Sequence, residues 1–249
     1  MRIKAIVGYD GTAYGGFQIQ DNAPTIQAAI EEVLARLTGA QTRLVAAGRT
    51  DAGVHAEGQV IAFDTGWRHP IGELQRGMNA LLPSQIAVFD LQEVAPRFHP
   101  RYDALTRTYQ YTLYCAPVRH PHHARYSLHI DRPLDVEAMA RAAEHLVGYQ
   151  DFLAFGSPPQ GHNSHRHVVR AAWSHQGPWL RFDIEANAFL YRMVRMVVGT
   201  MLRVGRGALT VEALVEILET RNREGAGPAA AAEGLCLKSV SYDDRVFSH

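Results

Sequence analysis

Residues 44–63 read LVAAGRTDAGVHAEGQVIAF and place a short polar loop between two apolar runs. The runs at 44–47 and 59–63 are apolar and short, which is typical of buried strands. The loop between them brackets one carboxylate, Asp51, with Gly48 and Gly53. Glycine permits tight turns and lets a backbone approach a ligand closely. We therefore expect a strand–loop–strand unit that presents Asp51 at its turn.

Strand and helix patterns alternate along the whole chain of 249 residues. Further β-rich runs occupy residues 3–9, 87–94, 106–114, 168–173, 180–184 and 235–240. Helical periodicity occupies residues 25–37, 71–81, 136–147, 189–204 and 211–218. Pro24 and Gly39 flank the first helix as start and stop signals. The Gly- and Ala-rich segment 223–233 is expected to be a mobile loop.

These elements predict an α+β fold. Strands and helices occur in similar proportion in residues 1–104 and 105–249, so we expect two similar mixed α/β halves. Their antiparallel or mixed sheets are expected to flank a central basic cleft. The Asp51 loop belongs to the first half.

The composition is that of an ordinary globular protein, with 47% hydrophobic and 20% charged residues. No apolar run reaches the roughly 18 to 20 residues that span a bilayer, and the N-terminus lacks a signal-peptide pattern. Cys115 and Cys236 lie in apolar runs and are expected to be reduced core residues. We therefore expect a cytoplasmic protein that does not associate with membranes.

The net charge is zero with neutral histidines, so only the placement of the cations is informative. Arginine greatly outnumbers lysine, which codon bias in a GC-rich genome explains as well as nucleic-acid binding does. In residues 189–207, which contain the predicted helix 189–204, the charged residues are Arg192, Arg195, Arg203 and Arg206. At about 100° per residue they fall within an arc of roughly 80°. They either project into water or, as the apolar opposite face favours, line a cleft that binds a carboxylate or phosphate.

A second basic stretch spans residues 97–125, where Asp103 is the single acidic residue. Tyrosines at 102, 109, 111 and 114 interleave with its positive charges. This pattern suits an RNA backbone with unstacked bases, but it equally suits a strand whose tyrosines pack in the core. The basic residues are Arg97, His99, Arg101, Arg107, Arg119, His120, His122, His123 and Arg125.

Several catalytic motifs are absent from the sequence. The Gly-rich residues 8–16 match neither the dinucleotide fingerprint nor the P-loop. His162, His165 and His167 could ligate zinc, but their Pro/Gly-flanked loop without a Cys pair favours RNA contact or a plain loop. Asp51 has Arg49 two residues away, which favours an ionised carboxylate that could act as a nucleophile. The alternative is a turn cap that bonds its own backbone.

Residues 48–56, GRTDAGVHA, resemble the active-site loop of the tRNA pseudouridine synthase A family. Other segments resemble that family in the same order, from residue 9 to residue 237. Phe17 departs from the tryptophan that the family often has, and the histidine-rich residues 156–167 read unlike its usual pattern. The resembling segments are 9–11 (YDG), 16–18 (GFQ), 79–83 (NALLP), 107–111 (RTYQY), 189–195 (FLYRMVR) and 227–229 (GPA) with 234–235 (GL).

The resemblance implies an enzyme that isomerises uridine to pseudouridine in the anticodon stem-loop of tRNA, around tRNA positions 38–40. It implies base flipping, no cofactor and no metal. Asp51 would be the nucleophile, Arg195 its ion-pair partner, and Tyr109 the residue stacked on the target base. Attack at the ribose C1′ or at the base C6 stays open.

The resemblance also implies further substrate-binding residues and a homodimer in which one tRNA contacts both subunits. Arg49 would contact the flipped nucleotide or its phosphate, and Leu235 would form an apolar wall of the pocket. Arg107 and Arg192 would bind substrate as well. Two alternatives compete with this function: an RNA-binding module without chemistry, and a metal-dependent nuclease that uses the histidines of residues 162–167.

Overall fold

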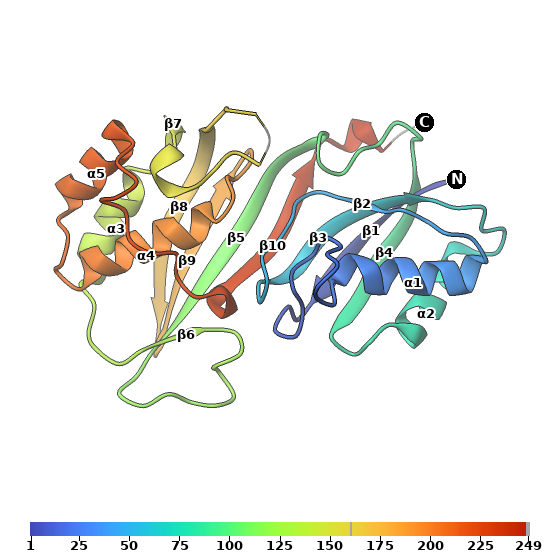
Figure 1. Ribbon diagram of the computed structural model, residues 1–249, viewed down its shortest axis with the longest axis horizontal. Helices are drawn as coiled ribbons and strands as arrows, with labels where there is room; N and C mark the ends of the chain where they lie inside the picture. The colour runs from blue at the N-terminus through green and yellow to red at the C-terminus, as the bar shows by residue number, and fades with distance from the viewer. Residues whose placement is uncertain (160, 248–249) are drawn as a thin grey trace. The chain divides into compact units, whose positions relative to one another are not determined.

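The computed structural model describes residues 1–159 and 161–247 of the chain (Figure 1). The chain groups into two compact units. Unit 1 comprises Met1–Leu105 and Cys236–His249, and unit 2 comprises Thr106–Leu235. The sequence division into residues 1–104 and 105–249 stays a prediction about domains. The C-terminal segment, which it assigned to the second half, is grouped here with unit 1.

Unit 1 is built on a sheet in which β1 lies between β3 and β4 and runs antiparallel to both. β10 runs parallel to β3 at Cys236 and Leu237, and β2 pairs antiparallel with β3. The strand predicted at 59–63 begins earlier, at His55, immediately after the Asp51 loop. The strands are β1 (Arg2–Tyr9), β2 (Val45–Ala46), β3 (His55–Asp64), β4 (Ile86–Val94) and β10 (Leu235–Tyr242).

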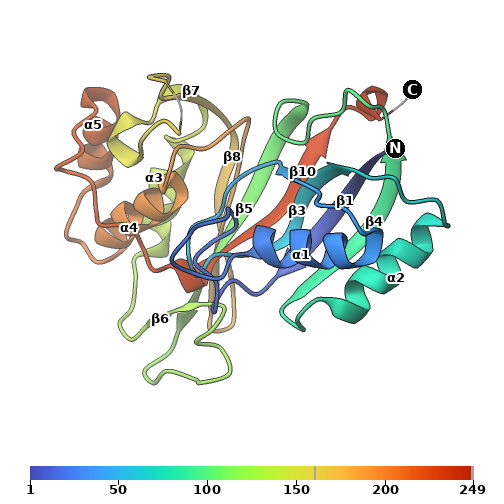
Figure 2. The same cartoon turned by 45° about the vertical axis from the view of Figure 1, so that its right-hand side comes forward.

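Both helices of unit 1, α1 (Ile26–Thr38) and α2 (Ile71–Leu81), cover the same face of its sheet (Figures 1 and 2). Thr25 caps α1 by accepting a hydrogen bond from the Ala28 N–H, and Gly39 ends it with a φ of 71°. Both predicted helices are therefore confirmed.

The C-terminal segment completes the core of unit 1. The Phe247 ring packs against Phe98, with 5.3 Å between ring centroids, and Lys4 Nζ lies 4.4 Å from the Phe247 centroid. Phe98 belongs to a buried cluster with Ala47 and Val60. Because Val60 lies on β3 and Ala47 directly follows β2, the segment that ends at Phe247 supports the base of the Asp51 loop.

Unit 2 is built on a sheet in which β9 lies between β5 and β8 and is antiparallel to both. β8 and β9 form the predicted hairpin, with Gly177 at a φ of 57° in its turn. β6 and β7 were not predicted, because they are three and four residues long and carry no periodic signal. The strands are β5 (Ala104–Cys115), β6 (Leu128–Ile130), β7 (Gly148–Asp151), β8 (His165–Gln176) and β9 (Trp179–Ala186).

The helices of unit 2 gather on one face of its sheet (Figures 1 and 2). They are α3 (Val136–Glu144), α4 (Met193–Gly205) and α5 (Val211–Thr220). The prediction that one helix starts at residue 189 is wrong. A pair of backbone hydrogen bonds between Ser157 and Tyr191 holds that segment extended, and Arg192 has a left-handed φ of 62°.

The predicted stripe of four arginines on one continuous helix is therefore also wrong. Only Arg195 and Arg203 lie within α4, whereas Arg192 and Arg206 occupy its two caps. The mixture of helices with mixed sheets confirms the predicted α+β class. Over the described ranges 1–159 and 161–247, no helix is long and apolar enough to cross a membrane.

Candidate active site

The Asp51 loop of unit 1 is held from one side by the segment before α1. The Phe17 N–H donates to the Thr50 carbonyl at 3.1 Å, and Gly16 forms a β-bridge with Asp51. Gly16 has a φ of 115°, and a Cβ there would lie 2.7 Å from the Thr50 carbonyl oxygen. Only glycine therefore permits this close approach beside the half-buried Asp51.

Two buried polar side chains hold the loop from the sheet side. The Tyr9 hydroxyl bonds the Thr50 hydroxyl at 2.8 Å. Gln59, which is fully buried, donates from Nε2 to the Gly48 carbonyl at 2.9 Å. Gly48 and Thr50, which precede Arg49 and Asp51, are thus hydrogen-bonded to strands of the sheet. These bonds limit how far the Asp51 carboxylate can move.

The far end of the loop is fixed to the turn after β1. His55 Nδ1 accepts a hydrogen bond from the Gly11 N–H at 3.1 Å and lies 3.3 Å from Asp10 Oδ1. A Cβ on Gly11 would lie only 2.0 Å from the Val54 carbonyl oxygen. The role of His55 in holding the loop was not predicted from the sequence, because its partners Asp10 and Gly11 lie more than 40 residues away in the chain.

In unit 2, Tyr109 and Arg107 share the buried face of β5. Tyr109 is 8% exposed, and its ring meets Phe189 edge-on at 5.0 Å between centroids. Arg107 is equally buried and donates from Nη1 to the Asn187 carbonyl at 2.7 Å. Arg107 therefore ties the strand that carries Tyr109 to the segment after β9.

Arg195 lies on α4 and is held by residues 225–231, here called the α4 strap. Arg195 Nε donates to the Ala230 carbonyl at 2.7 Å, and the Ala230 N–H donates back to the Arg195 carbonyl at 2.9 Å. Gly199 lets the strap approach, because a Cβ there would lie 1.8 Å from the Pro228 carbonyl oxygen.

Two more side chains of α4 bind the strap. The Gly227 N–H donates to Thr200 Oγ1 at 2.8 Å, and Arg203 Nη1 donates to the Gly225 carbonyl at 2.7 Å. We expected a mobile loop over residues 223–233, but the strap is hydrogen-bonded along α4. The close glycines on both segments are the physical reason.

Tyr111 connects the strap to the sheet. Its hydroxyl donates to the Ala231 carbonyl at 2.8 Å. Burial raises the pKa of Tyr111 well above its ordinary value, and the charge of Glu233 raises it further, while Arg195 opposes the rise. The hydroxyl therefore stays protonated at neutral pH and remains a hydrogen-bond donor to the strap.

The other predicted site residues, Arg49, Arg192 and Leu235, lie in three separate segments. Arg49 is exposed in the Asp51 loop, and the Arg192 guanidinium lies 5.0 Å from the centroid of the exposed Tyr191 ring. Leu235 is buried at the start of β10. Asp51 and Arg49 belong to unit 1 and the remaining predicted residues to unit 2, so the pairing of Asp51 with Arg195 stays a prediction.

A family model described as "tRNA pseudouridine synthase" matches residues 5–103 and 142–243 of the chain. The chain belongs to the tRNA pseudouridine synthase family. Among its relatives, the tRNA pseudouridine synthase A of Moorella thermoacetica is 48% identical over 96% of this chain and 99% of that protein. Those of Syntrophomonas wolfei and Burkholderia thailandensis are each 42% identical, over 98% and 97% of this chain and 98% and 90% of theirs.

Membership in the tRNA pseudouridine synthase family confirms both the resemblance and the predicted class of enzyme. The matched residues include Asp51, Arg195 and Leu235, whereas residues 104–141, with Tyr109 and Arg107, lie outside the match. In the histidine-rich segment of this synthase, the ring of His165 stacks on the ring of Tyr149, with 5.4 Å between the ring centroids. Within the described residues, no group of three or more His, Cys, Asp or Glu side chains is placed to hold a metal.

Proposed function

We propose that this protein isomerises uridine to pseudouridine in the anticodon stem-loop of tRNA, around tRNA positions 38–40, with Asp51 as the nucleophile. Family membership and the construction of the Asp51 loop support this proposal. The residues on both sides of Asp51 are hydrogen-bonded to the sheet or to the segment before α1. A carboxylate that attacks a fixed carbon needs this pre-organisation, because misplacement by about 1 Å can cost a hundredfold in rate.

The reaction is an isomerisation, so its atoms balance without a co-reactant. The bond between uracil N1 and the ribose C1′ breaks, and C5 bonds to C1′. C5 loses a proton and N1 gains one. The Asp51 carboxylate attacks either C1′ or the base C6 and is released again, which requires it to be ionised in both cases. Flipping the base out of the stack makes these atoms accessible and costs a few kcal/mol.

We assign the remaining roles by the same proposal. Arg195 pairs with Asp51, and the Ala230 carbonyl orients its guanidinium by binding Nε. Tyr109 stacks on the flipped base, and Leu235 forms the apolar wall of the pocket.

The other arginines would contact the RNA or support the strand that carries Tyr109. Arg49 and Arg192, both exposed, contact phosphate or the flipped nucleotide. Arg107 supports substrate binding through the strand that carries Tyr109. We also propose that the protein forms a homodimer in which one tRNA contacts both subunits, and that it is located in the cytoplasm.

The Asp51→Asn variant tests the nucleophile. We expect no pseudouridine in unmodified tRNA incubated with this variant, because an amide cannot replace the attacking carboxylate. Its Kd for tRNA should stay within a few-fold of the wild-type value. The exposed Asp21 of unit 1 provides the matched control, and Asp21→Asn should retain full activity.

The same experiment separates the alternatives. Retained activity in Asp51→Asn would refute the nucleophile assignment. A wild-type protein that binds tRNA but forms no pseudouridine would be an RNA-binding module. RNA cleavage that a chelator abolishes would indicate the metal-dependent nuclease.

Arg195→Ala and Arg203→Ala test the ion pair. Both side chains are half-buried on α4, and both donate to a carbonyl of the strap, so loss of the strap contact is common to the two variants. Only Arg195 is proposed to hold Asp51. We expect kcat to fall about a hundredfold or more for Arg195→Ala and less than about tenfold for Arg203→Ala. Equal, mild losses would mean that these arginines only anchor the strap and bind phosphate.

A further inference from the structure

The loop of residues 116–127, which joins β5 to β6, lies at one end of unit 2 (Figure 1). Its histidines form a cluster of five rings with Tyr114 and Trp179. His120 stacks on His123 with 4.4 Å between ring centroids and 27° between planes. His123 meets Trp179 at 4.7 Å, and Tyr114 lies 4.9 Å from His123 and 5.1 Å from Trp179. His122 completes this ring cluster by meeting His120 edge-on at 5.3 Å.

Hydrogen bonds anchor both ends of the loop that carries these histidines. The Cys115 N–H donates to the Pro178 carbonyl at 2.7 Å, which joins the end of β5 to the β8–β9 turn. The Ser127 hydroxyl donates to the His123 carbonyl at 2.7 Å. A surface that is already ordered loses little conformational entropy on binding.

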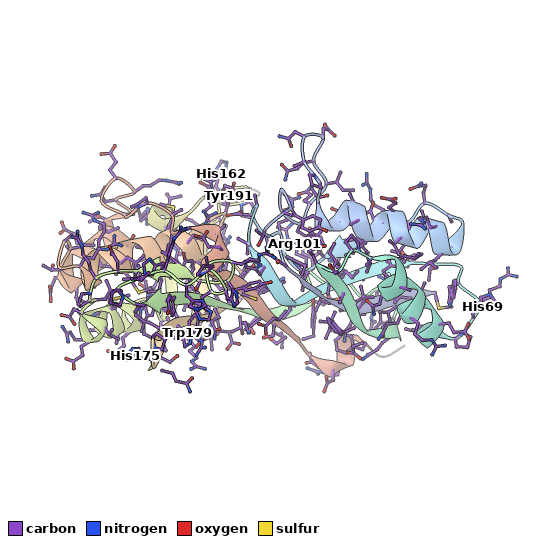
Figure 3. All side chains as sticks on the ribbon, turned by 90° about the horizontal axis from the view of Figure 1, so that it is seen from below. His69, Arg101, His162, His175, Trp179 and Tyr191 are labelled. Atoms are coloured by element: carbon purple, nitrogen blue, oxygen red, sulfur yellow. The ribbon has the colours of Figure 1, made fainter. Side chains whose placement is uncertain are left out.

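The ring cluster is exposed on its outer side and has arginines beside it. His120 and His122 are exposed, as is the neighbouring Arg119. The Arg181 guanidinium lies 5.9 Å from the Trp179 centroid. Residues 116–130 and 174–181 contain no acidic residue. Figure 3 looks at unit 2 from the end where this loop lies and labels Trp179 there.

We propose that the ring cluster is a second RNA-binding surface, on which unpaired bases stack on the exposed ring of His120 or of His122 while Arg119 and Arg181 contact phosphate. Aromatic and imidazole rings stack on any base, and nearby cations without acids favour an anionic backbone. This inference rests on the proposed function, because the RNA is the tRNA substrate. Residues 104–141, which include this loop, lie outside the match to the family model.

The double variant His120→Ala/His122→Ala tests this surface. Both rings are exposed, so we expect the variant to fold with an unchanged Tm. Its Kd for unmodified tRNA, measured by fluorescence anisotropy, should rise about tenfold. The loss of one base-stacking contact, about 1–3 kcal/mol, corresponds to a rise in Kd of about fivefold to 150-fold. The single-turnover rate at saturating tRNA should not change, because the variant leaves the Asp51 loop intact.

A matched control removes two other exposed histidines. His69 of unit 1 lies 5.1 Å from Trp67, and His145 follows α3 (His69 is labelled in Figure 3). His69→Ala/His145→Ala should bind tRNA with the wild-type Kd. A second variant, Trp179→Ala, should weaken tRNA binding because His123 loses its ring contact. Trp179→Phe should keep tRNA binding close to the wild-type value because an aromatic ring remains against His123.

Three results would overturn the inference. The first is a wild-type Kd in the His120→Ala/His122→Ala variant. The second is a lowered Tm that accompanies the raised Kd, which would make the cluster a purely structural element. The third is a change of oligomeric state on size-exclusion chromatography, which would make it a contact with another copy of the chain. Absence of pseudouridine in the wild-type reaction would instead refute the proposed function, and the Kd comparison would still be read independently.

Discussion

Replacing Thr200 with valine would show how much the contact between α4 and its strap contributes to stability. Thr200 is fully buried. Its hydroxyl donates to the Met196 carbonyl at 2.8 Å and accepts from the Gly227 N–H at 2.8 Å. Valine has nearly the same shape but no hydroxyl. The Gly227 N–H would then lack this acceptor in the interior of unit 2.

The expected magnitude follows from the cost of an unsatisfied buried donor, which is about 1–3 kcal/mol. We therefore expect the free energy of unfolding to fall by about 2 kcal/mol, which is roughly a thirtyfold change in the unfolding equilibrium. For a chain of this size the Tm should fall by about 4–8 °C. We also expect kcat to fall, because Ala230 of the strap orients Arg195.

Urea unfolding followed by circular dichroism would measure the effect, and Thr220→Val provides the matched control. The Thr220 hydroxyl makes the same type of bond, to the Glu216 carbonyl at 2.6 Å, but the residue is exposed on α5. Its replacement should change the free energy of unfolding by less than about 0.5 kcal/mol. Equal losses in the two variants would refute the reasoning, because the strap contact would then contribute nothing.

Three further predictions concern unit 1. Tyr9→Phe removes the hydroxyl that holds the Asp51 loop, so the single-turnover rate should fall about tenfold with an unchanged Kd for tRNA. Phe247→Ala removes a ring from the core beneath that loop, and urea unfolding should show a loss of about 2 kcal/mol. Burial raises the pKa of Cys236 from 9.0 to about 11, so in a Cys115→Ser background iodoacetamide should alkylate it at pH 8 roughly a hundredfold more slowly than an ordinary thiol. Because the folded protein disfavours the thiolate, stability should fall as the pH rises above about 9.

Each of these predictions has a clear contrary result. A Tyr9→Phe rate equal to that of wild type would mean that the remaining contacts hold the loop by themselves. Unfolding of Phe247→Ala at the wild-type urea midpoint would show that the C-terminal segment does not support the core. Fast alkylation of Cys236 at pH 8, without an increase up to pH 11, would contradict its raised pKa.

Local sequence signals were sufficient for most helices and strands. Thr25 and Gly39 delimit α1 because a hydroxyl N-cap and a left-handed C-cap are determined within a few residues of the chain. The β8–β9 hairpin follows from two runs separated by Gly177 and Pro178. Asp51 likewise could be singled out, because two glycines and an arginine surround it within one short loop.

Only the tertiary structure decided where α4 begins and what holds the loop and the strap. The bonds from Ser157 to Tyr191 start α4 late, and no pattern within residues 189–204 encodes them. The bonds from Gly11 to His55 and from Gly227 to Thr200 join residues 44 and 27 positions apart in the chain. Periodicity and capping report neighbours along one element, whereas these contacts exist only after distant segments have packed. The sequence by itself therefore determined the local elements and singled out Asp51 as the predicted nucleophile, and packing decided what fixes the Asp51 loop and the α4 strap in place.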